Sequence, residues 1–592
     1  MIIKPEHPRP DFLRDSWQSL NGVWRFAFDP KDEGEQLHWQ CKPDFPLEIQ
    51  VPFSYQAALS GIGSKEACDT VWYALAADLT PLWEHEEIRL HFEACDYHTT
   101  VWVNGQLACT HTGGYSPFDC DIKPLANAQR QAEIVVRAYD PPDPSIPRGK
   151  QAWDKPHGCW YTPTTGIWQT VWLEGCSHTR IESLRITPDI DTSYVYLEVP
   201  VRFWREGLAL EYHVTFQDKT IASGTVFLTK PRVRLSLPIP EPDEINPVHW
   251  WTPESPSLFD LRLRVLDGNR ELDLVQSYFG MRKISVRNGQ LLLNNKPYFQ
   301  RLVLDQGYWP DGLLTAPSDE ALCKDILLAK AMGFDGCRKH QKMEEARFYY
   351  WADKLGFLVW GELPSAYEFH MDEFCRLETD MTEFIRRDYN HPSIVAWVPL
   401  NESWGVRNIV ANTEQQAAAA ALYYHIKALD KTRLVSNNDG WELVSETDFY
   451  GVHDYTAYAS QAQSGYADPE QLLSHHASHR LCGASNFRYD AAKPVLITEY
   501  GGIAFADEQE NAWGYNGKVN GEEEFLERFR SMTAFYQSLP YVWGLCYTQL
   551  TDVEQETNGL LTPDRTAKVS PRAIYAINRA FSPTIPKSNQ QA

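Results

Sequence analysis

The sequence lacks the features that several classes of protein require. No apolar run approaches the roughly 20 residues that a membrane-spanning helix needs, so we expect no membrane partner. The first residues, MIIKPEHPRPDF, do not have the charged and then apolar layout of a signal peptide. The 12 cysteines form no CxxC pair and have no companion histidines, which argues against a zinc site and a disulfide framework. We therefore expect a cytoplasmic protein with reduced thiols and no bound metal.

Basic residues are also scarce, with 55 Lys and Arg against 79 Asp and Glu and a net charge of −24. This balance argues against a nucleic-acid partner, because such binding depends on basic contacts to phosphates. At 592 residues the chain is too long for one hydrophobic core, so several domains are expected. What the sequence does have is tryptophan, 21 in all. Flat indole faces suit carbohydrate rings, although most tryptophans in proteins are simply buried.

Three regions with different patterns follow one another along the chain. Residues 1–180 contain short, partly alternating strands separated by turns, which predicts a β-sandwich. Residues 181–287 continue the β pattern over a length that fits an immunoglobulin-like sandwich, and we interpret it as a spacer. In residues 288–592 apolar strands alternate with amphipathic helices, and the eight strands predict a (β/α)8 TIM barrel. The strand after residues 433–439 follows so quickly that one crossover is weakly defined.

Two apolar strands of the predicted barrel end on a glutamate. Glu402 stands in SIVAWVPLNESWG and Glu499 in PVLITEYGG, at the ends of the fourth and seventh strands. Active sites of such barrels lie at the C-terminal ends of the strands, so the two carboxylates face each other across the mouth. Either residue alone has about even odds of only capping a helix or pairing with an arginine. Together they predict cleavage of a glycosidic bond, which uses one carboxyl group as acid and one as nucleophile.

The neighbours of both glutamates resemble glycoside hydrolase family 2. Asn401 and Glu402, preceded by NHPSI, look like its acid/base signature, and TEYGG looks like its nucleophile strand. Further upstream, WQSLNGVWRFAFDP, TTGIWQTVWLE and YFGMRKISV are similar to the opening of the family, the end of its jelly-roll sugar-binding sandwich and the entry to its barrel. The likeness covers nearly the whole chain. It is specific for the family, which includes β-galactosidases, β-glucuronidases and β-mannosidases, and much less specific for the sugar.

The resemblance implies a retaining, double-displacement hydrolysis. We expect no organic or metal cofactor, because two carboxyl groups suffice for the chemistry and no ligand cluster for the magnesium of some family galactosidases is evident. The resemblance assigns roles to six residues: Glu402 as acid/base, Glu499 as nucleophile, Asn401 as donor to the sugar 2-hydroxyl, Tyr450 as hydrogen-bond partner of the nucleophile, Arg338 as the cation that keeps it ionised, and Trp543 as the floor on which the sugar stacks.

The sequence departs from the family pattern around the expected pocket. His340 follows Arg338 by two residues, where many members have a histidine after three. The loop after the first barrel strand carries Asp305, Gln306, Trp309 and Asp311 in place of a histidine-containing acidic stretch, and Trp160 occupies the position of a sugar-contacting aspartate. We expect Asp305, Trp309, Trp160 and the segments 153–160 and 513–518 to shape the pocket rim.

The sugar is the least determined part of the function. The carboxylate-reading Asn-x-Lys of glucuronidases is missing after the last strand, and Asn516 to Lys518 in another loop is a weak match. A neutral sugar needs no such cation, so the first expectation is an exo-acting β-galactosidase. An α-L-arabinosidase comes next, and a β-glucuronidase or β-mannosidase stays possible. A non-catalytic carbohydrate-binding protein is the alternative of another class. The expected partner is a glycoside, and assembly as a homo-oligomer is left open.

Overall fold

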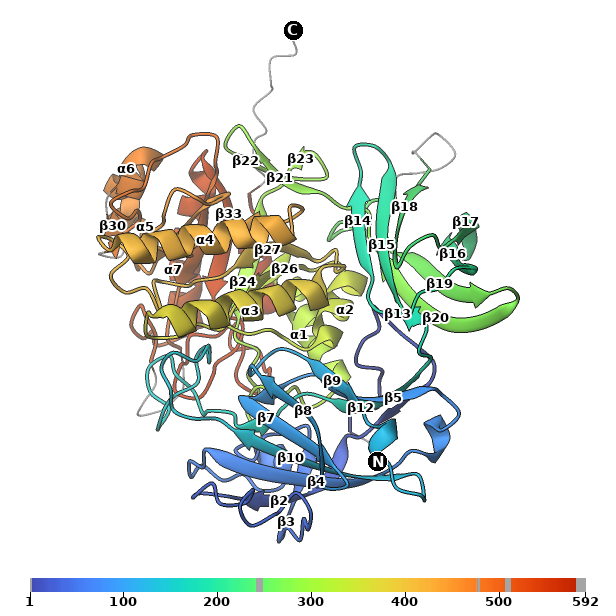
Figure 1. Ribbon diagram of the computed structural model, residues 1–592. Coiled ribbons are helices and arrows are strands. Elements are labelled where there is room, and N and C mark those ends of the chain that lie inside the picture. The colour runs from blue at the N-terminus through green and yellow to red at the C-terminus, as the bar shows by residue number, and fades with distance from the viewer. Residues whose placement is uncertain (1–2, 241–248, 475, 478–479, 506–512, 582–592) are drawn as a thin grey trace.

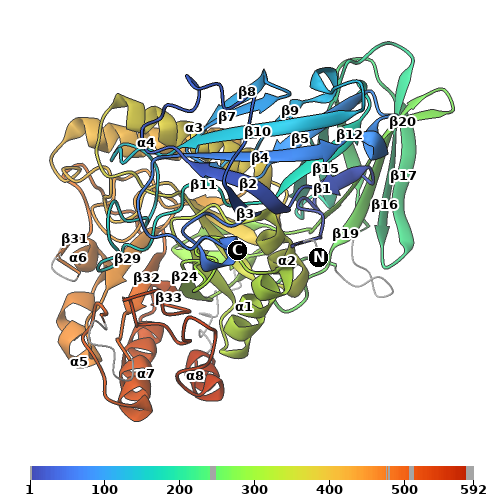
Figure 2. The same cartoon turned by 90° about the horizontal axis from the view of Figure 1, so that it is seen from below.

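The computed structural model describes residues 3–240, 249–474, 476–477, 480–505 and 513–581. Figure 1 shows an N-terminal sandwich (blue), a second sandwich (green) and a barrel (yellow to red), which confirms the predicted fold class. The two sandwiches contact the barrel from different sides, and Figure 2 shows the N-terminal sandwich lying across it. In the described ranges no helix combines the length and hydropathy that crossing a membrane requires.

The N-terminal sandwich consists of two antiparallel sheets packed face to face. Every second side chain of the central strand β10 points into the core, namely Ala132, Ile134, Val136 and Ala138. The larger sheet has the order β3 (Leu47–Val51), β2 (Gly22–Phe28), β4 (Thr70–Asp78), β10 (Gln131–Tyr139), β7 (His98–Val103), β8 (Gln106–Thr112). The smaller sheet has the order β1 (Trp17–Ser19), β12 (Val171–Cys176), β5 (Glu87–Phe92), β9 (Phe118–Asp121).

The second sandwich follows the same rule of alternation. In β19 (Phe259–Asp267) the apolar residues Phe259, Leu261 and Leu263 are buried, while Asp260 and Arg262 face outward. One sheet pairs β19 with β16 (Leu208–Phe216) and β20 (Arg270–Phe279), and β16 also with β17 (Lys219–Phe227). In the other sheet β15 (Tyr194–Arg202) pairs with β13 (Arg180–Ile181), β14 (Arg185–Asp189) and β18 (Arg232–Pro238).

Eight parallel strands form the curled sheet of the barrel. Their buried, apolar character on both faces is typical of a sheet covered by helices. In spatial order they are β28 (Leu434–Val435), β27 (Ile394–Val398), β26 (Leu358–Glu362), β25 (Gly336–Lys339), β24 (Gln300–Asp305), β33 (Val542–Thr548), β32 (Val495–Gly501) and β29 (Tyr450–Asp454). The helices are α1 (Asp319–Ala331), α2 (Ala346–Leu355), α3 (Met371–Asp388), α4 (Thr413–Leu429), α5 (Ala459–Ala462), α6 (Pro469–Ser474), α7 (Glu522–Ser538) and α8 (Pro571–Asn578).

The crossover after residues 433–439, which the sequence defined weakly, lacks a helix, so the alternation of strands and helices is interrupted there. Residues 436–449, which join β28 to β29, contain no helix, and no ladder joins these two strands among the described residues.

A small sheet closes the end of the barrel at which the strands begin. It consists of β21 (Ile284–Arg287), β22 (Gln290–Leu293) and β23 (Lys296–Pro297). Its apolar residues join the same hydrophobic cluster as the inner residues of the barrel.

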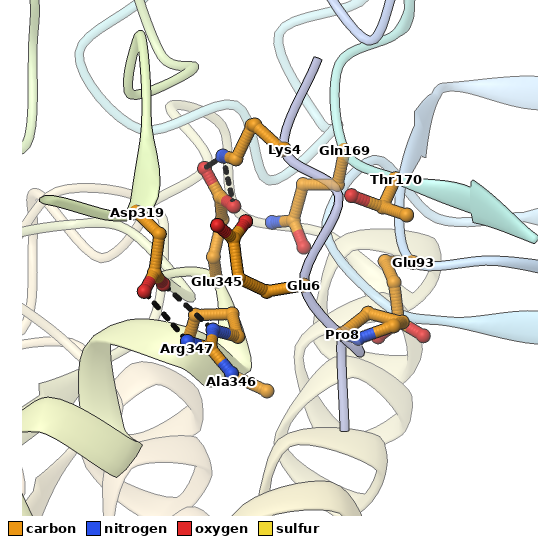
Figure 3. Close-up of a pocket in the computed structure, with 10 residues that line it drawn as sticks. All are labelled: Lys4, Glu6, Pro8, Glu93, Gln169, Thr170, Asp319, Glu345, Ala346 and Arg347. Carbon is orange, nitrogen blue, oxygen red and sulfur yellow. Dashed lines mark hydrogen bonds and ion pairs between the residues drawn. The ribbon is translucent and has the colours of Figure 1, made fainter. Parts of the chain in front are cut away.

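The N-terminal segment fastens the first sandwich to the barrel. Lys4 forms an ion pair with Glu345, just before α2 (Figure 3). Arg347 of α2, which binds Asp319 of α1 with an Nη2–Oδ2 distance of 2.6 Å, also donates through Nη1 to the carbonyl oxygen of His7 at 3.4 Å. The cavity beside these residues has a volume of only about 10 Å³, room for about one water molecule. The N-terminal segment is therefore packed closely against the barrel at this point.

A long loop of the N-terminal sandwich, residues 140–165, extends to the mouth of the barrel (Figure 1, lower left). The amides of Arg148 and Gly149 donate to the carbonyl oxygen of Ser365, which follows β26, at 3.1 and 3.0 Å. Gln555, which follows β33, donates to the carbonyl oxygen of Gly158 at 2.8 Å. The loop is thus attached to the barrel on two sides, and it carries its side chains to the site described next.

Candidate active site

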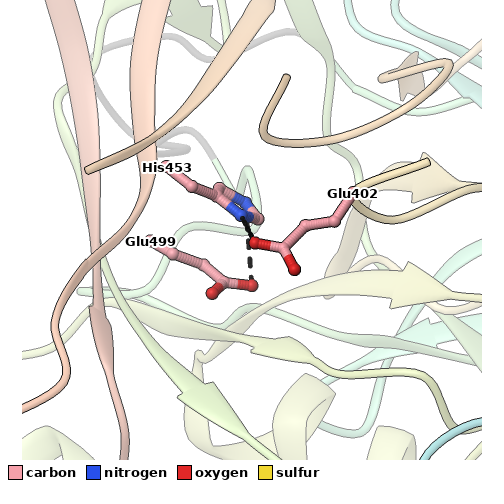
Figure 4. Close-up of side chains that lie close together, drawn as sticks. All are labelled: Glu402, His453 and Glu499. Carbon is pink, nitrogen blue, oxygen red and sulfur yellow. Dashed lines mark hydrogen bonds and ion pairs between the residues drawn. The ribbon is translucent and has the colours of Figure 1, made fainter. Parts of the chain in front are cut away.

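The structure brings Glu402 and Glu499 together at the mouth of the barrel (Figure 4). Glu499 lies near the end of β32, and Glu402 follows β27 after a short stretch. One oxygen of each carboxyl group and one ring nitrogen of His453 lie within 4.8 Å of one another. The backbone of Glu402 has a φ of 51°, and its amide donates to the carbonyl oxygen of Asp439 at 2.9 Å. Such a left-handed conformation in a glutamate is strained, and strain of this kind gathers at functional sites.

Glu499 is held in its ionised form by donors on both carboxylate oxygens. Nη1 of Arg338 donates to Oε1 at 2.8 Å, and the hydroxyl of Tyr455 donates to Oε2. Burial alone raises the pKa of this carboxyl group, but the positive charges of His453 and Arg338 outweigh that effect and hold the pKa below its usual range. An ionised carboxylate at this place is suited to act as a nucleophile.

Glu402 has a more accessible carboxyl group, 16% exposed against 5% for Glu499. Its Oε1 lies 2.7 Å from Nδ1 of His453, whose Nε2 lies 3.2 Å from Asp439. Burial alone lowers the pKa of His453, but Glu499, Asp439 and Glu402 together raise it to about 9. A protonated His453 therefore donates to both Glu402 and Asp439 and orients the exposed carboxyl group.

Arg338, which is fully buried in β25, links the two halves of the site. Its Nε donates to Glu362 at 2.7 Å and its Nη2 to the amide oxygen of Asn401 at 2.6 Å. With its oxygen taken, Asn401 has its amide nitrogen left to donate to a ligand. His340 lies 3.0 Å from Glu362, and burial places the pKa of this histidine well below its usual value. His340 is accordingly neutral.

The role assigned to Tyr450 is wrong, and Tyr455 fills it. Tyr450 stands at the start of β29, where its hydroxyl accepts a hydrogen bond from the amide of Asp490 at 2.8 Å. Tyr455 directly follows the last residue of β29 and bonds Glu499. Five residues of extended strand span roughly 16 Å, so the two tyrosines lie at opposite ends of the barrel.

The role assigned to Trp543 is wrong for the same reason. Trp543 is the second residue of β33, 5% exposed, and belongs to the apolar cluster that includes Trp251, Trp360 and Phe449. The carboxyl end of β33 is Thr548, five residues further on, and that is the end that lies at the mouth. A sugar at the two glutamates does not reach Trp543.

Asp305 and Trp309 lie in the expected loop but make structural contacts. The carboxylate of Asp305 lies 2.5 Å from Nζ of Lys339, and the guanidinium of Arg565 lies 3.5 Å from the ring centroid of Trp309. In the part of the chain that the structure describes, no direct contact joins either residue to Glu402 or Glu499. Their influence on the sugar pocket stays a prediction.

Trp160 lies at the barrel mouth, as the rim prediction required. It is partly exposed, and its ring stacks on Trp404 with 5.4 Å between the centroids. Trp404 follows Glu402 by two residues, and Nε1 of Trp160 donates to the hydroxyl of Tyr367, in the loop after β26, at 2.9 Å. The N-terminal sandwich thus contributes an aromatic wall next to the acid/base candidate.

Five residues of the site were not predicted from the sequence: Tyr455, His453, Asp439, Trp404 and Lys150. Four of them carried a signal, because they end a barrel strand or follow one closely, as Glu402 does. Lys150 carried none, since it comes from the other domain. The three groups of Figure 4 also have the spacing of metal ligands. A protonated histidine offers no lone pair, however, and the adjacent Arg338 repels a cation, so the set fits acid–base chemistry better than metal binding.

Comparison with known proteins places the chain in a family. Residues 17–154 match the sugar binding domain of glycosyl hydrolases family 2, residues 179–282 match the middle domain, and residues 284–570 match the TIM barrel domain. The chain belongs to glycosyl hydrolase family 2. It is therefore a glycoside hydrolase, and the alternative of a non-catalytic binding protein is set aside.

Individual relatives resemble the chain at low sequence identity. A β-glucuronidase of Paenibacillus borealis is 22% identical over 95% of this chain and 97% of its own length. A β-galactosidase of Lactococcus lactis is 25% identical over 74% of this chain but 43% of its own. The solved structure of a β-glucuronidase from Ruminococcus gnavus superimposes with a TM-score of 0.79 at 18% identity, covering 98% of this chain and all of its own. At this identity, the similarity to the solved structure shows a shared fold and no more.

Proposed function

We propose that this hydrolase removes a terminal β-linked sugar with retention of configuration, through a covalent glycosyl-enzyme intermediate. The observation that carries the proposal is the proximity of the two carboxyl groups, with one oxygen of each within 4.8 Å of the other. Retaining enzymes keep the groups roughly 5–5.5 Å apart, whereas inverting enzymes leave roughly 6.5–9.5 Å for a water molecule.

The surroundings of each glutamate support a division of labour. Glu499, ionised between Arg338 and Tyr455, attacks the anomeric carbon. Glu402, the more accessible of the two, protonates the leaving oxygen and then removes a proton from the water that releases the sugar. The loop of residues 140–165 lies across one side of the mouth, which favours a terminal sugar over an internal one.

For the sugar, two candidates have specific support. The missing Asn-x-Lys after the last strand favours a neutral β-galactoside, and one relative carries that name. A β-glucuronide is supported by the names of other relatives, which match the chain over nearly its whole length. The α-L-arabinoside and β-mannoside alternatives have no further support and enter the test as members of a panel.

The proposal is tested with nitrophenyl glycosides of these four sugars. NMR of the first-formed product reports its anomeric configuration, and release of the inverted sugar contradicts the mechanism. Glu499→Gln is expected to lose activity on every substrate, on the order of 10⁵-fold, as loss of a nucleophile does in other hydrolases. Glu402→Gln is expected to lose most on poor leaving groups, which need a proton, and least on activated ones. Equal losses of both variants across all leaving groups contradict the assigned roles.

A further inference from the structure

Lys150 is a buried lysine whose ammonium group has no anionic partner. In the described part of the chain four lysines are buried: Lys4, Lys150, Lys339 and Lys342. The other three each form an ion pair with a glutamate or aspartate. Among the same residues Lys150 forms none, and the centroid of the Trp404 ring lies 5.8 Å from its Nζ. Lysines are almost never this buried, 6% exposed, unless they are paired, so the retention of Lys150 calls for an explanation.

The backbone fixes where this ammonium lies. The carbonyl oxygen of Lys150 accepts a hydrogen bond from the amide of Tyr161 at 2.8 Å. The preceding residue, Gly149, donates to Ser365 at 3.0 Å and accepts from the hydroxyl of Tyr367. The backbone of Lys150 is thus held within the loop, and the backbone of Gly149 is held on the barrel. A group held in this way is positioned for binding, unlike a lysine on a free loop tip.

The charges around Lys150 belong to the active site. Burial lowers its pKa, but Cys159 and the carboxylates of Glu556, Glu499 and Glu402 raise it above the usual value. Lys150 therefore stays charged. The effect is mutual, since Lys150 is one of the cations that lower the pKa of Glu499. The contact with the ring of Trp404, two residues after Glu402, places this ammonium group of the N-terminal sandwich beside the site.

The other cations near the glutamates are already engaged. Arg338 binds Glu362 and Glu499, and His453 bridges Glu402 and Asp439. Lys518, the lysine of the weak Asn-x-Lys match, is exposed to solvent. Within the described residues, Lys150 is the cation at this site that is left for a ligand.

We propose that Lys150 binds the carboxylate of a uronic acid and so selects uronides over neutral glycosides. The inference rests on the proposed hydrolysis and names its substrate class. An anionic group on the sugar gives the ammonium the partner that the protein does not supply, whereas a neutral hydroxyl leaves most of the desolvation cost uncompensated. The selecting residue would then come from the N-terminal sandwich, not from a barrel loop. Trp404 and Trp160, next to it, provide the aromatic side of the same pocket.

The test compares two substrates that differ only at C6, nitrophenyl β-D-glucuronide and nitrophenyl β-D-glucoside, with the corresponding β-D-galacturonide and β-D-galactoside as a second pair. Lys150→Met keeps the length of the side chain and removes its charge. We expect kcat/KM to fall about 30-fold or more on the uronide that the protein prefers, mainly through KM, and to stay within about threefold on the neutral partner. Lys150→Arg is expected to recover part of the loss. Lys42→Ala removes an exposed lysine of the same sandwich, outside the loop at the barrel mouth, and serves as the matched control.

Binding separates this inference from the proposed reaction. Calorimetry with D-glucuronate and D-galacturonate needs no turnover, and we expect the wild type to bind at least one of them at least about 30-fold more tightly than Lys150→Met does. Equal losses on uronides and neutral glycosides would assign Lys150 to structure or to general catalysis and overturn the inference. A wild type that cleaves neutral galactosides and no uronide would also overturn it, while leaving the proposed hydrolysis intact. Failure to cleave any glycoside, with uronate binding that depends on Lys150, would contradict the proposed reaction alone.

Discussion

At the carboxyl end of the barrel strands, Arg338, Glu362, Asn401, Asp439, His453 and the two glutamates form a buried network in which charged groups touch one another. At the amino end, Trp251, Trp360, Phe449 and Trp543 pack with aliphatic side chains and the small sheet β21–β23. The first end consists of charged groups whose desolvation is unfavourable, and the second consists of apolar contacts. Binding and chemistry can use the first, whereas the second contributes stability. The predictions below test whether these two roles are separate.

The largest effect at the amino end is expected for Trp543→Ala. Removing a buried tryptophan typically costs about 3–5 kcal/mol of unfolding free energy, because a cavity replaces its contacts. We expect the urea concentration at which activity is lost to fall markedly, while kcat/KM at 25 °C without urea stays within about threefold of wild type. Trp543→Phe, which leaves a smaller cavity, is the control and loses less. A variant that keeps its stability but loses the sugar specificity would restore Trp543 to the active site.

The same comparison explains how far the sequence alone could reach. The order of strands predicted the barrel, because an apolar run followed by an amphipathic helix has few other solutions. It also predicted Glu402 and Glu499, since each stands at or next to the carboxyl end of its strand, whereas Arg338 came from the resemblance to the family. Tyr450 and Trp543 lie on the correct strands but at the wrong ends. Tyrosine and tryptophan suit the assigned roles as residue types. Their positions at the start of the strands, away from the active site, exclude those roles.

Other residues could not be found from any local pattern. Lys150 reaches the site through backbone contacts between residues more than 200 positions apart, such as Gly149 with Ser365. His453 carried a signal in its place near the end of a barrel strand, but its role depends on Glu402 and Asp439, which lie on either side of its ring. Contacts of this kind depend on how domains and strand ends meet, which periodicity does not encode.

A matched pair of tyrosine variants compares the two ends of the barrel, with smaller expected effects than those of Trp543→Ala. Tyr455→Phe removes a hydrogen bond to the charged Glu499, and bonds to charged groups contribute roughly 1.5–3 kcal/mol. We expect kcat/KM to fall about 10- to 100-fold with little change in stability. Tyr450→Phe removes the contact to the amide of Asp490 at the other end and is expected to keep kcat/KM within about threefold. A larger loss in Tyr450→Phe than in Tyr455→Phe, measured on one substrate, would reverse the assignment.

The smallest expected effect is a displacement of the acid limb of the pH profile. The positive charges near Glu499 hold its pKa below the ordinary 4.5, so the nucleophile stays ionised and kcat/KM persists as the pH falls to that value. The largest of these opposing influences comes from His453, whose own pKa of about 9 keeps it charged throughout this range. His453→Gln removes the charge and retains a side chain able to donate to Glu402. The pKa of Glu499 then rises, and the acid limb of kcat/KM moves to higher pH. Wild type and variant are measured on the same substrate, so that any ionisation of the substrate is common to both. An acid limb that stays in place would mean that the other groups around Glu499 keep it ionised without His453, and that His453 acts on Glu402 only.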